Sequence, residues 1–565
     1  MNDSRKILIY QVLPRYFGNT RRSNVKNGSI KDNGVGKFAH FTKKALEAIK
    51  SLGVTHIWYT GVLEHATCSD YSQYGILSDH PAVVKGKAGS PYAVKDYYDV
   101  DPDLARSVPD RLKEFQQLIA RTHQQGLKVV IDFVPNHLAR QYHSDVAPEG
   151  VEDFGAKDKT DWYFSPQNNF YYLPGQPFRG QFDLKAGAEN PYEECPAKVT
   201  GNDCFKACPT VNDWYETVKL NYGIDYQGCH SEYFNPLPDT WLKMRDVLLY
   251  WCAKGVDAFR CDMAEMVPAA FWAWVTREVR SQYPEMLFIG EVYNPGLYRQ
   301  YLQSGFDYLY DKIGLYDTLK AVVQGYAPAF SLTRCWQSLG DIQDRMLNFL
   351  ENHDEQRLAS PFFAGDARKG LPALVVSATM NVNPFMLYYG QELGEKGMYE
   401  EGFSGLDGRS SIFDYWCIER LADWNNNGKF NEEKLSPEQV DLRRQYQKIL
   451  QVCQSEKAIT QGLFYDLMYV NDDASRFDNN RLYAYMRKYR SELLLVVANF
   501  ADRDLHASVR IPRHLFDFWQ INPQNAIVAR DLLSGDNFVC QLNPDSLIAL
   551  QIPANQSRIL KFELV

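Results

Sequence analysis

Short apolar runs recur along the first 400 residues, and a segment with helical periodicity follows most of them. In residues 110–125, for example, Phe115, Leu118 and Ile119 fall on one helical face, and Gly126 follows as a terminating residue. Strands that alternate with helices indicate a parallel sheet, and eight of them predict an α/β fold of the (β/α)8 TIM barrel type. The eight expected strands are residues 7–12, 54–59, 129–134, 256–259, 287–289, 306–309, 346–350 and 385–389.

Two parts of the chain depart from this alternation. After the third expected strand, roughly a hundred residues rich in Gly, Pro, Asn and Asp are too long for a loop, and they predict a small inserted domain. After about residue 455, alternating and β-branched runs separated by turn residues predict a C-terminal all-β sandwich domain. The expected strand runs are residues 493–500, 507–511, 526–529, 547–552 and 557–564. We therefore expect a first barrel part (1–137), an inserted domain (138–235), a second barrel part (236–455) and the sandwich (456–565).

Composition narrows the classes of partner. The 565 residues carry a net charge of −9, which argues against nucleic acid or an anionic membrane surface as a partner. No window approaches eighteen unbroken apolar residues, so no membrane span is expected. The apolar run at residues 7–10 is too short for a signal peptide. A cytoplasmic location is the default expectation, although a protein whose signal peptide has been removed would look the same.

Two sequence features raise the question of a metal. The 11 cysteines are scattered and odd in number, which favours free thiols over a disulfide framework. Their tightest group leaves a structural zinc site open as the less favoured alternative: Cys195, Cys204, Cys208, Cys229 and His230. Residues 423–428 resemble the start of an EF-hand loop, but Lys434 stands where the closing glutamate belongs, so a polar surface turn is favoured.

Acidic residues and histidines follow four of the expected strands. In a barrel, the side chains that carry chemistry lie at the carboxyl ends of the strands, so these groups should converge on one rim. Arg260 and Asp262 are two apart on one strand and face the same side, where the guanidinium should keep the carboxylate ionised. Neighbouring carboxylates should raise the pKa of Glu291 and make it a proton donor. Two carboxyls with separated pKa values are the working groups of glycoside hydrolysis.

Four motifs in order carry a family resemblance. They are Asp132-x-x-x-Asn136-His137, Gly255-x-x-x-Phe259-Arg260-x-Asp262, Gly290-Glu291 and Asn352-His353-Asp354. Together they resemble the signature segments of the α-amylase family of glycoside hydrolases (family 13). Residues 9–17 and 384–392 resemble the first and eighth barrel strands of that family.

The resemblance implies a role for each matching residue. Asp262 would be the nucleophile, Glu291 the general acid/base and Asp354 the third carboxylate, which grips the distorted sugar. The same resemblance assigns substrate binding to a further set: Tyr92, His137, Arg260 and His353. Tyr92 would be the aromatic platform beneath the sugar, and Asp132 would orient Arg260. Arg357 would either contact the site or pair with a nearby acid.

The chain departs from the family pattern in three places. Glu265 and Met266 replace the Lys-His pair that follows the nucleophile, so binding on the leaving side of the cleft is expected to differ. Lys219 stands where a calcium-binding aspartate is common, so calcium is possible but doubtful and no cofactor is expected to be required. Met263 is neither the Thr nor the Val that often accompanies α-1,4 or α-1,6 preference.

The expected function is retaining hydrolysis of α-1,4-glucosidic bonds in malto-oligosaccharides or starch-like α-glucans. Transglycosylation and exo-acting α-glucosidase activity stay open, because both use the same nucleophile. An inactive carbohydrate-binding subunit is disfavoured, because all three carboxylates are present.

Overall fold

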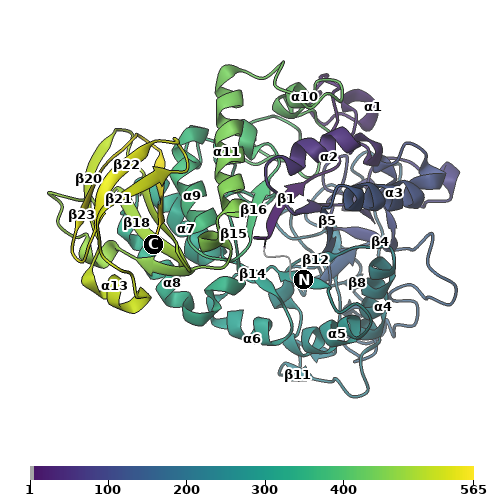
Figure 1. The fold of residues 1–565 in the computed structure, drawn as a ribbon. Helices are drawn as coiled ribbons and strands as arrows, with labels where there is room; N and C mark the ends of the chain where they lie inside the picture. The colour runs from purple at the N-terminus through teal and green to yellow at the C-terminus, as the bar shows by residue number, and fades with distance from the viewer. Residues whose placement is uncertain (1–4, 565) are drawn as a thin grey trace.

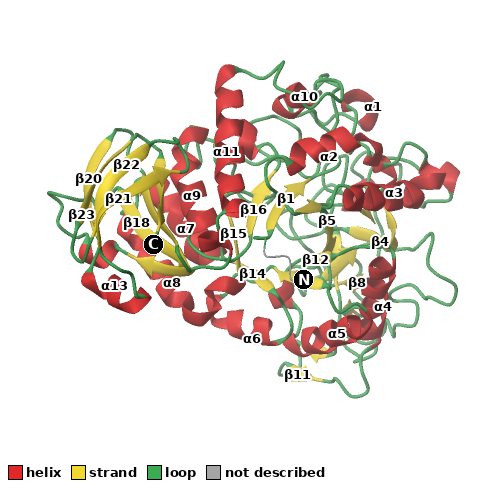
Figure 2. Ribbon diagram, in the orientation of Figure 1, coloured by secondary structure: helices red, strands yellow, loops and turns green. Residues whose placement is uncertain are grey.

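The computed structural model describes residues 5–564. Residues 1–4 and Val565 lie outside the described range. Within the described range, eight parallel strands close into a barrel in the order β1-β16-β15-β14-β13-β12-β5-β2, which confirms the predicted TIM barrel. Figure 2 shows the strands surrounded by helices. The barrel strands are β1 (Leu8–Val12), β2 (His56–Tyr59), β5 (Lys128–Phe133), β12 (Ala258–Cys261), β13 (Leu287–Gly290), β14 (Tyr308–Tyr310), β15 (Met346–Phe349) and β16 (Phe385–Tyr388).

The helices follow from apolar spacing and from end signals. In α3, Phe115, Leu118 and Ile119 are buried against the barrel, and Gly126 adopts a positive φ of 68° just after the helix, as its missing Cβ allows. The helices are α1 (Ile30–Asn33), α2 (Lys43–Lys50), α3 (Arg111–Gln124), α4 (Asp239–Ala253), α5 (Ala269–Gln282), α6 (Tyr298–Gln303), α7 (Asp317–Val323), α8 (Leu332–Leu339), α9 (Leu371–Thr379), α10 (Glu419–Asn425), α11 (Pro437–Ser455), α12 (Lys457–Thr460) and α13 (Arg513–Trp519).

Small antiparallel sheets extend from the barrel rim. In the long segment after β5 they are β6 (His137–Ala139) with β9 (Thr217–Lys219), β7 (Tyr172–Leu173) with β8 (Ala197–Lys198), and β10 (Ile224–Asp225) with β11 (Ser231–Glu232). This segment has a small apolar core of its own that includes Tyr171, Leu173 and Phe178. A further hairpin, β3 (Leu63–His65) with β4 (Val94–Val100), follows β2 and was not expected from the sequence.

The C-terminal region is antiparallel β structure beside the barrel. A six-stranded sheet runs in the order β17-β18-β19-β24-β21-β22, and β20 pairs with β23. Figure 1 shows these yellow strands on one side of the barrel, next to α7, α8 and α9. Their bounds are β17 (Leu463–Asp466), β18 (Leu482–Tyr489), β19 (Glu492–Asn499), β20 (Leu505–Arg510), β21 (Gln524–Asp531), β22 (Asn537–Leu542), β23 (Leu547–Ile552) and β24 (Ser557–Glu563).

The ligand groups of the two metal sites weighed from the sequence do not come together among residues 5–564. Among the described residues, no three of the cysteines near residue 204 and His230 lie close enough to share one ion, and all of these thiols are free. Asp423 and Asn425 belong to helix α10 rather than to a loop, and Asp423 pairs with Arg22 at 2.5 Å. Within the described range, no helix has the length and apolar character needed to cross a membrane.

Candidate active site

The barrel register brings the two central carboxyls together. Cys261 of β12 lies beside Gly290 of β13, so the next residues, Asp262 and Glu291, leave neighbouring strands at the same level. Arg260 is likewise in register with Asp132 on β5. Because parallel strands end on one rim, all four side chains lie on the carboxyl-end side of the barrel.

Arg260 connects these acids. Its Nη1 donates a hydrogen bond of 2.6 Å to Asp262 Oδ1 and lies 3.6 Å from Asp132 Oδ1. Its Nη2 forms an ion pair of 2.7 Å with Glu291 Oε2. The Arg260 side chain is 1% exposed, so these contacts act with little screening by water. One buried guanidinium therefore serves both of the carboxyls that the resemblance assigns to catalysis.

Glu291 has further donors that sequence reasoning missed. The hydroxyl of Tyr293 donates to Oε1 at 2.6 Å, and the backbone N–H of Met263 donates to Oε2 at 2.8 Å. Met263 has a positive φ of 43°, which is uncommon for a residue with a side chain and turns its N–H toward Glu291. The position of Tyr293, two residues after Glu291, was the only available signal.

The pKa of Asp262 shifts in the direction opposite to the one expected from the neighbouring guanidinium. Burial and the neighbouring Glu291 raise the pKa of Asp262 well above its ordinary value, although Arg260 acts in the opposite direction. The guanidinium is shared, so it only partly offsets the loss of solvation. The Asp354 side chain is 44% exposed at the pocket, so loss of solvation raises its pKa only in part, and His353 and Arg260 lower the pKa to about 2.

His353 and Asp354 form a hydrogen-bonded pair beside the aromatic platform. The side-chain amide of Gln11 contacts His353 Nδ1 at 2.9 Å, and Nε2 lies 3.0 Å from Asp354 Oδ2. An N–H from Gln11 makes Nδ1 the acceptor, so the proton on Nε2 points to the carboxylate. The rings of Tyr92 and His353 stack with centroids 5.0 Å apart, and the Tyr92 hydroxyl donates to Asp132 at 3.3 Å.

His137 is held by a chain of donors that starts at Lys219. The buried Lys219 Nζ donates to Asn136 Oδ1 at 3.1 Å and pairs with Asp203 at 2.5 Å. This fixes the amide of Asn136, whose nitrogen lies 3.1 Å from His137 Nδ1 and makes that atom an acceptor. Burial and the nearby Lys219 lower the pKa of His137 to about 3, so at neutral pH the ring is neutral and carries its proton on Nε2.

A pocket of about 300 Å³ unites the three carboxyls with the expected sugar-binding residues. Asp262, Glu291 and Asp354 line it together with Tyr92, His137 and His353, whereas Arg260 lies behind the two central acids. Several further lining residues come from outlying segments whose place in the fold no motif reveals: Lys85, Trp214, Glu216 and Phe413.

Two residues left open by the sequence lie away from this pocket. Glu265 Oε2 accepts the backbone N–H groups of Tyr293 and Asn294, at 3.2 and 3.0 Å, and Glu265 does not line the pocket. Glu265 therefore supports the segment that follows Glu291. Arg357 is fully buried and pairs with Glu351 at 3.0 Å. Of the two roles considered for it, Arg357 therefore pairs with a nearby acid and does not line the pocket.

Comparisons with known proteins agree with this geometry. Residues 11–439 match the family model of the α-amylase catalytic domain. The chain is 23% identical to alpha-amylase 3 of Dictyoglomus thermophilum over 442 residues, which cover 72% of this chain and 74% of that protein. It is 22% identical to a cyclomaltodextrinase of a Bacillus species over 510 residues, which cover 87% and 72%.

A solved structure shares the whole fold. The noncanonic maltogenic α-amylase AmyB from Thermotoga neapolitana superposes with a TM-score of 0.63 and 18% identity, and the match covers 100% of both chains. At that identity the likeness supports the fold, while the family match carries the activity class. The chain therefore belongs to the α-amylase family (family 13) and is an α-amylase-like glycoside hydrolase that acts on α-glucans.

Proposed function

We propose that this enzyme hydrolyses α-1,4-glucosidic bonds of malto-oligosaccharides with retention of configuration. The observation that carries the proposal is that a single guanidinium contacts both Asp262 and Glu291 on the pocket side of the barrel. Retaining glycosidases use two closely spaced carboxyls, one as nucleophile and one as acid and then base. Asp262 and Glu291 supply such a pair.

In the proposed first step, Glu291 protonates the glycosidic oxygen as Asp262 attacks the anomeric carbon. The bond from that carbon to the leaving sugar breaks, and a glycosyl ester with Asp262 forms. In the second step the ionised Glu291 takes a proton from water, the water oxygen attacks the anomeric carbon, and the Asp262 carboxylate is released. Arg260 stabilises the ionised carboxylate at each stage.

The remaining pocket residues are proposed to hold the sugar at the cleavage position. Tyr92 offers a ring face for stacking, and its orientation is fixed by Asp132 and by the His353 ring. Neutral His137 offers an N–H donor, and the more exposed Asp354 accepts sugar hydroxyls. We propose that no cofactor takes part, and a cytoplasmic location stays a prediction.

Exo-action on short chains is the second candidate. Lys85 and Glu216 both line the pocket and form an ion pair of 3.0 Å, with Lys85 also facing the rings of Tyr215 and Phe413. A bridge across the rim favours a substrate that ends in the pocket over a long chain that passes through it. Transglycosylation uses the same residues, with a sugar hydroxyl in place of water.

Product analysis tests these alternatives. The purified chain is incubated with maltoheptaose, maltose, isomaltose and pullulan, and the products are resolved over time. Hydrolysis of α-1,4 bonds predicts cleavage of maltoheptaose and no cleavage of isomaltose, whereas products longer than the substrate would indicate transglycosylation. Proton NMR of the first products should give the α-anomer, and a β-anomer would exclude retention.

A further inference from the structure

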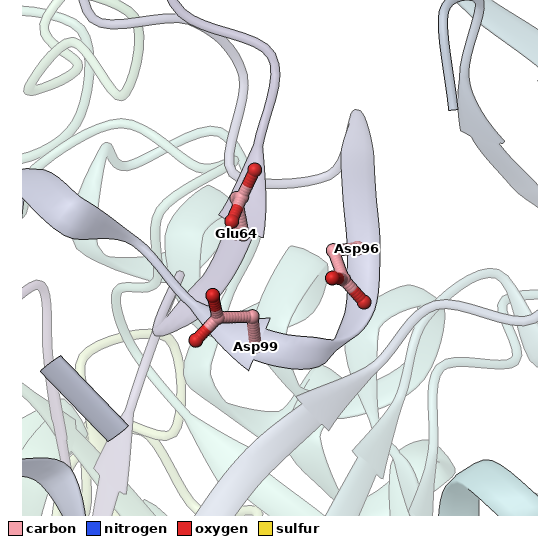
Figure 3. A group of neighbouring side chains, drawn as sticks. All are labelled: Glu64, Asp96 and Asp99. Carbon is pink, nitrogen blue, oxygen red and sulfur yellow. The ribbon is translucent and has the colours of Figure 1, made fainter. Parts of the chain in front are cut away.

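Three buried carboxyls meet in the hairpin β3–β4, outside the catalytic pocket. Glu64 on β3 lies directly across from Asp96 on β4, and the register of the two strands shifts on both sides of Glu64. Asp99 lies three residues further along β4, and carboxyl oxygens of all three residues lie within 4.8 Å of one another. Figure 3 shows the three neighbouring side chains, with Glu64 on one strand and Asp96 and Asp99 on the other.

Glu64 has no hydrogen-bonding partner for its charge among the residues that the structure describes. It is 1% exposed, and neither of its carboxyl oxygens accepts a hydrogen bond from them. Asp96, by contrast, accepts the backbone N–H groups of Tyr98 and Asp145, at 2.7 and 2.8 Å. A buried carboxylate without partners is costly, and like charges directly opposite in a hairpin add to that cost.

The neighbouring groups do not balance this negative charge. Arg111 donates to Asp99 at 2.6 Å, while Lys95 is engaged by Asp79 at 3.2 Å. A fourth carboxyl, that of Asp145, is 7% exposed and has one oxygen without a partner.

His143 is the remaining titratable group beside Asp145. It lies 3.6 Å from that carboxyl and 2.9 Å from Asp153. Even with His143 protonated, the four carboxyls would face Arg111, a lysine (Lys95) that is shared with Asp79, and an imidazolium that is shared with Asp153.

We propose that Glu64, Asp96 and Asp99 bind a divalent cation, with Asp145, whose backbone N–H bonds to Asp96, adding negative charge beside them. The donors are all carboxylate oxygens, which favour a hard cation such as Ca²⁺ over zinc or copper. Ligand oxygens about 2.3–2.6 Å from a Ca²⁺ ion lie at most about 5 Å from one another, in keeping with the spacing found here. None of the four residues lines the catalytic pocket, so the ion stabilises the hairpin and takes no part in the reaction.

A proton shared between Glu64 and Asp99 is the competing explanation. Burial and the neighbouring Asp99 and Asp96 raise the pKa of Glu64 well above its ordinary value, so an acid form would be neutral without any metal. The two explanations differ in their response to calcium and to pH. A group whose pKa is raised on folding contributes stability at low pH and loses it as the pH rises.

Thermal unfolding with and without calcium separates the two. The full chain is treated with EDTA, transferred to metal-free buffer and unfolded in the absence or presence of excess CaCl₂, with Tb³⁺ luminescence as a direct binding probe. We expect calcium to raise the Tm of the wild type by roughly 3–6 °C. Glu64→Gln keeps the shape of the acid but removes its charge, so its Tm without metal should equal or exceed that of the wild type and ignore calcium.

Two further variants complete the experiment. Asp145→Asn, in a half-buried loop segment, should weaken the calcium response and replaces Glu64→Gln if that variant does not fold. Asp536→Asn removes an exposed acid from the acidic turn around Arg558 and should keep the full response. A wild-type Tm that ignores calcium but falls as the pH rises would overturn the proposal in favour of the shared proton. A calcium response that persists in Glu64→Gln would place the ion elsewhere and overturn it equally.

Discussion

Asp262 and Glu291 differ in the donors that surround them. Asp262 accepts a hydrogen bond from one guanidinium nitrogen, whereas Glu291 accepts hydrogen bonds from a phenol and a backbone N–H and forms an ion pair with the second guanidinium nitrogen. The two otherwise similar carboxyls therefore differ in their surroundings, which is a physical basis for two different roles.

Replacement of Asp262 by Asn should remove turnover while leaving the fold intact. The amide cannot form the glycosyl ester, so kcat should fall by about a thousandfold or more. Asp257→Asn is the matched control, because Asp257 lies just before the same strand at the opposite end of the barrel and pairs with His123 and Lys128. Activity of the Asp262 variant within tenfold of the wild type would exclude it as the nucleophile.

The raised pKa of Asp262 predicts the acid limb of the pH profile. The nucleophile must be ionised, so kcat/KM should increase with pH through a pKa above the usual carboxyl value of about 3.9. Below that pH the protonated Asp262 cannot attack. Stopped assays of kcat/KM between pH 3 and pH 8 measure the limb, and a plateau that extends down to pH 4 would contradict the assignment.

Tyr293 is predicted to position the acid/base Glu291. Loss of its hydroxyl in Tyr293→Phe removes a charge-assisted hydrogen bond, which should lower kcat by on the order of tenfold with little change in KM. Tyr326→Phe, at an 84% exposed tyrosine, is the control. An unchanged kcat, or equal changes in kcat and KM, would reduce Tyr293 to a packing role.

The sequence predicts which residues gather in the pocket better than how they are held there. The pocket contains Asp262, Glu291 and Asp354 because parallel strands end on one rim, which follows from the strand pattern alone. The hydrogen bond from the backbone N–H of Met263 to Glu291 depends on a positive φ at Met263, which its residue type does not predict. The charge state of Asp262 likewise depends on burial and on sharing of Arg260, and both arise only in three dimensions.

At the scale of elements, Lys219 connects the segment between β5 and α4 to the residues that follow barrel strand β5. This lysine of β9 lies across from His137 of β6, and its buried ammonium bridges Asn136 and Asp203. An ammonium can offset a carboxylate and donate to a carbonyl, as a bound cation would. The sequence signalled the loss of a calcium ligand here, but not the ammonium contacts that take its place.

Activity is therefore predicted to survive removal of metal. With a fixed positive charge from Lys219 next to Asn136, a cation would be repelled from this position. Initial rates on maltoheptaose, measured well below the unfolding temperature, should agree within about twofold with and without EDTA. An effect of calcium on Tm without an effect on activity would be attributed to the ion proposed between β3 and β4. Loss of activity in EDTA that calcium restores would show that the enzyme needs a bound calcium ion in spite of Lys219.

At the scale of the whole molecule, the barrel was predictable because its strands are buried on both faces and read as apolar runs. The strands of the C-terminal region were harder to predict from the sequence. Strands β19, β20, β21, β23 and β24 fall on the expected runs, whereas β17, β18 and β22 went unseen. Strand β18 carries tyrosines and Arg487 at buried positions, so its sequence does not read as apolar although its first six residues are buried.

Arg487 explains why these parts should unfold together. It lies fully buried in β18 without a carboxylate partner, and burial lowers its pKa to about 10. Its guanidinium donates instead to four backbone carbonyls: Met380 after α9, Ala458 and Ile459 of α12, and Gly462 before β17. Charge-assisted bonds to oxygens from both regions connect the barrel to the C-terminal sheet.

Arg487→Ala should lower the Tm by about 5 °C or more and leave KM nearly unchanged. The substitution opens a cavity and deprives buried carbonyls of donors at a cost of about 1–3 kcal/mol each. Arg510→Ala is the control, because Arg510 forms an exposed pair with Asp545 that should contribute about 1 kcal/mol or less. Calorimetry of the wild type should give one transition for barrel and sheet. Two separate transitions, or equal Tm losses in the two variants, would mean that Arg487 does not couple them.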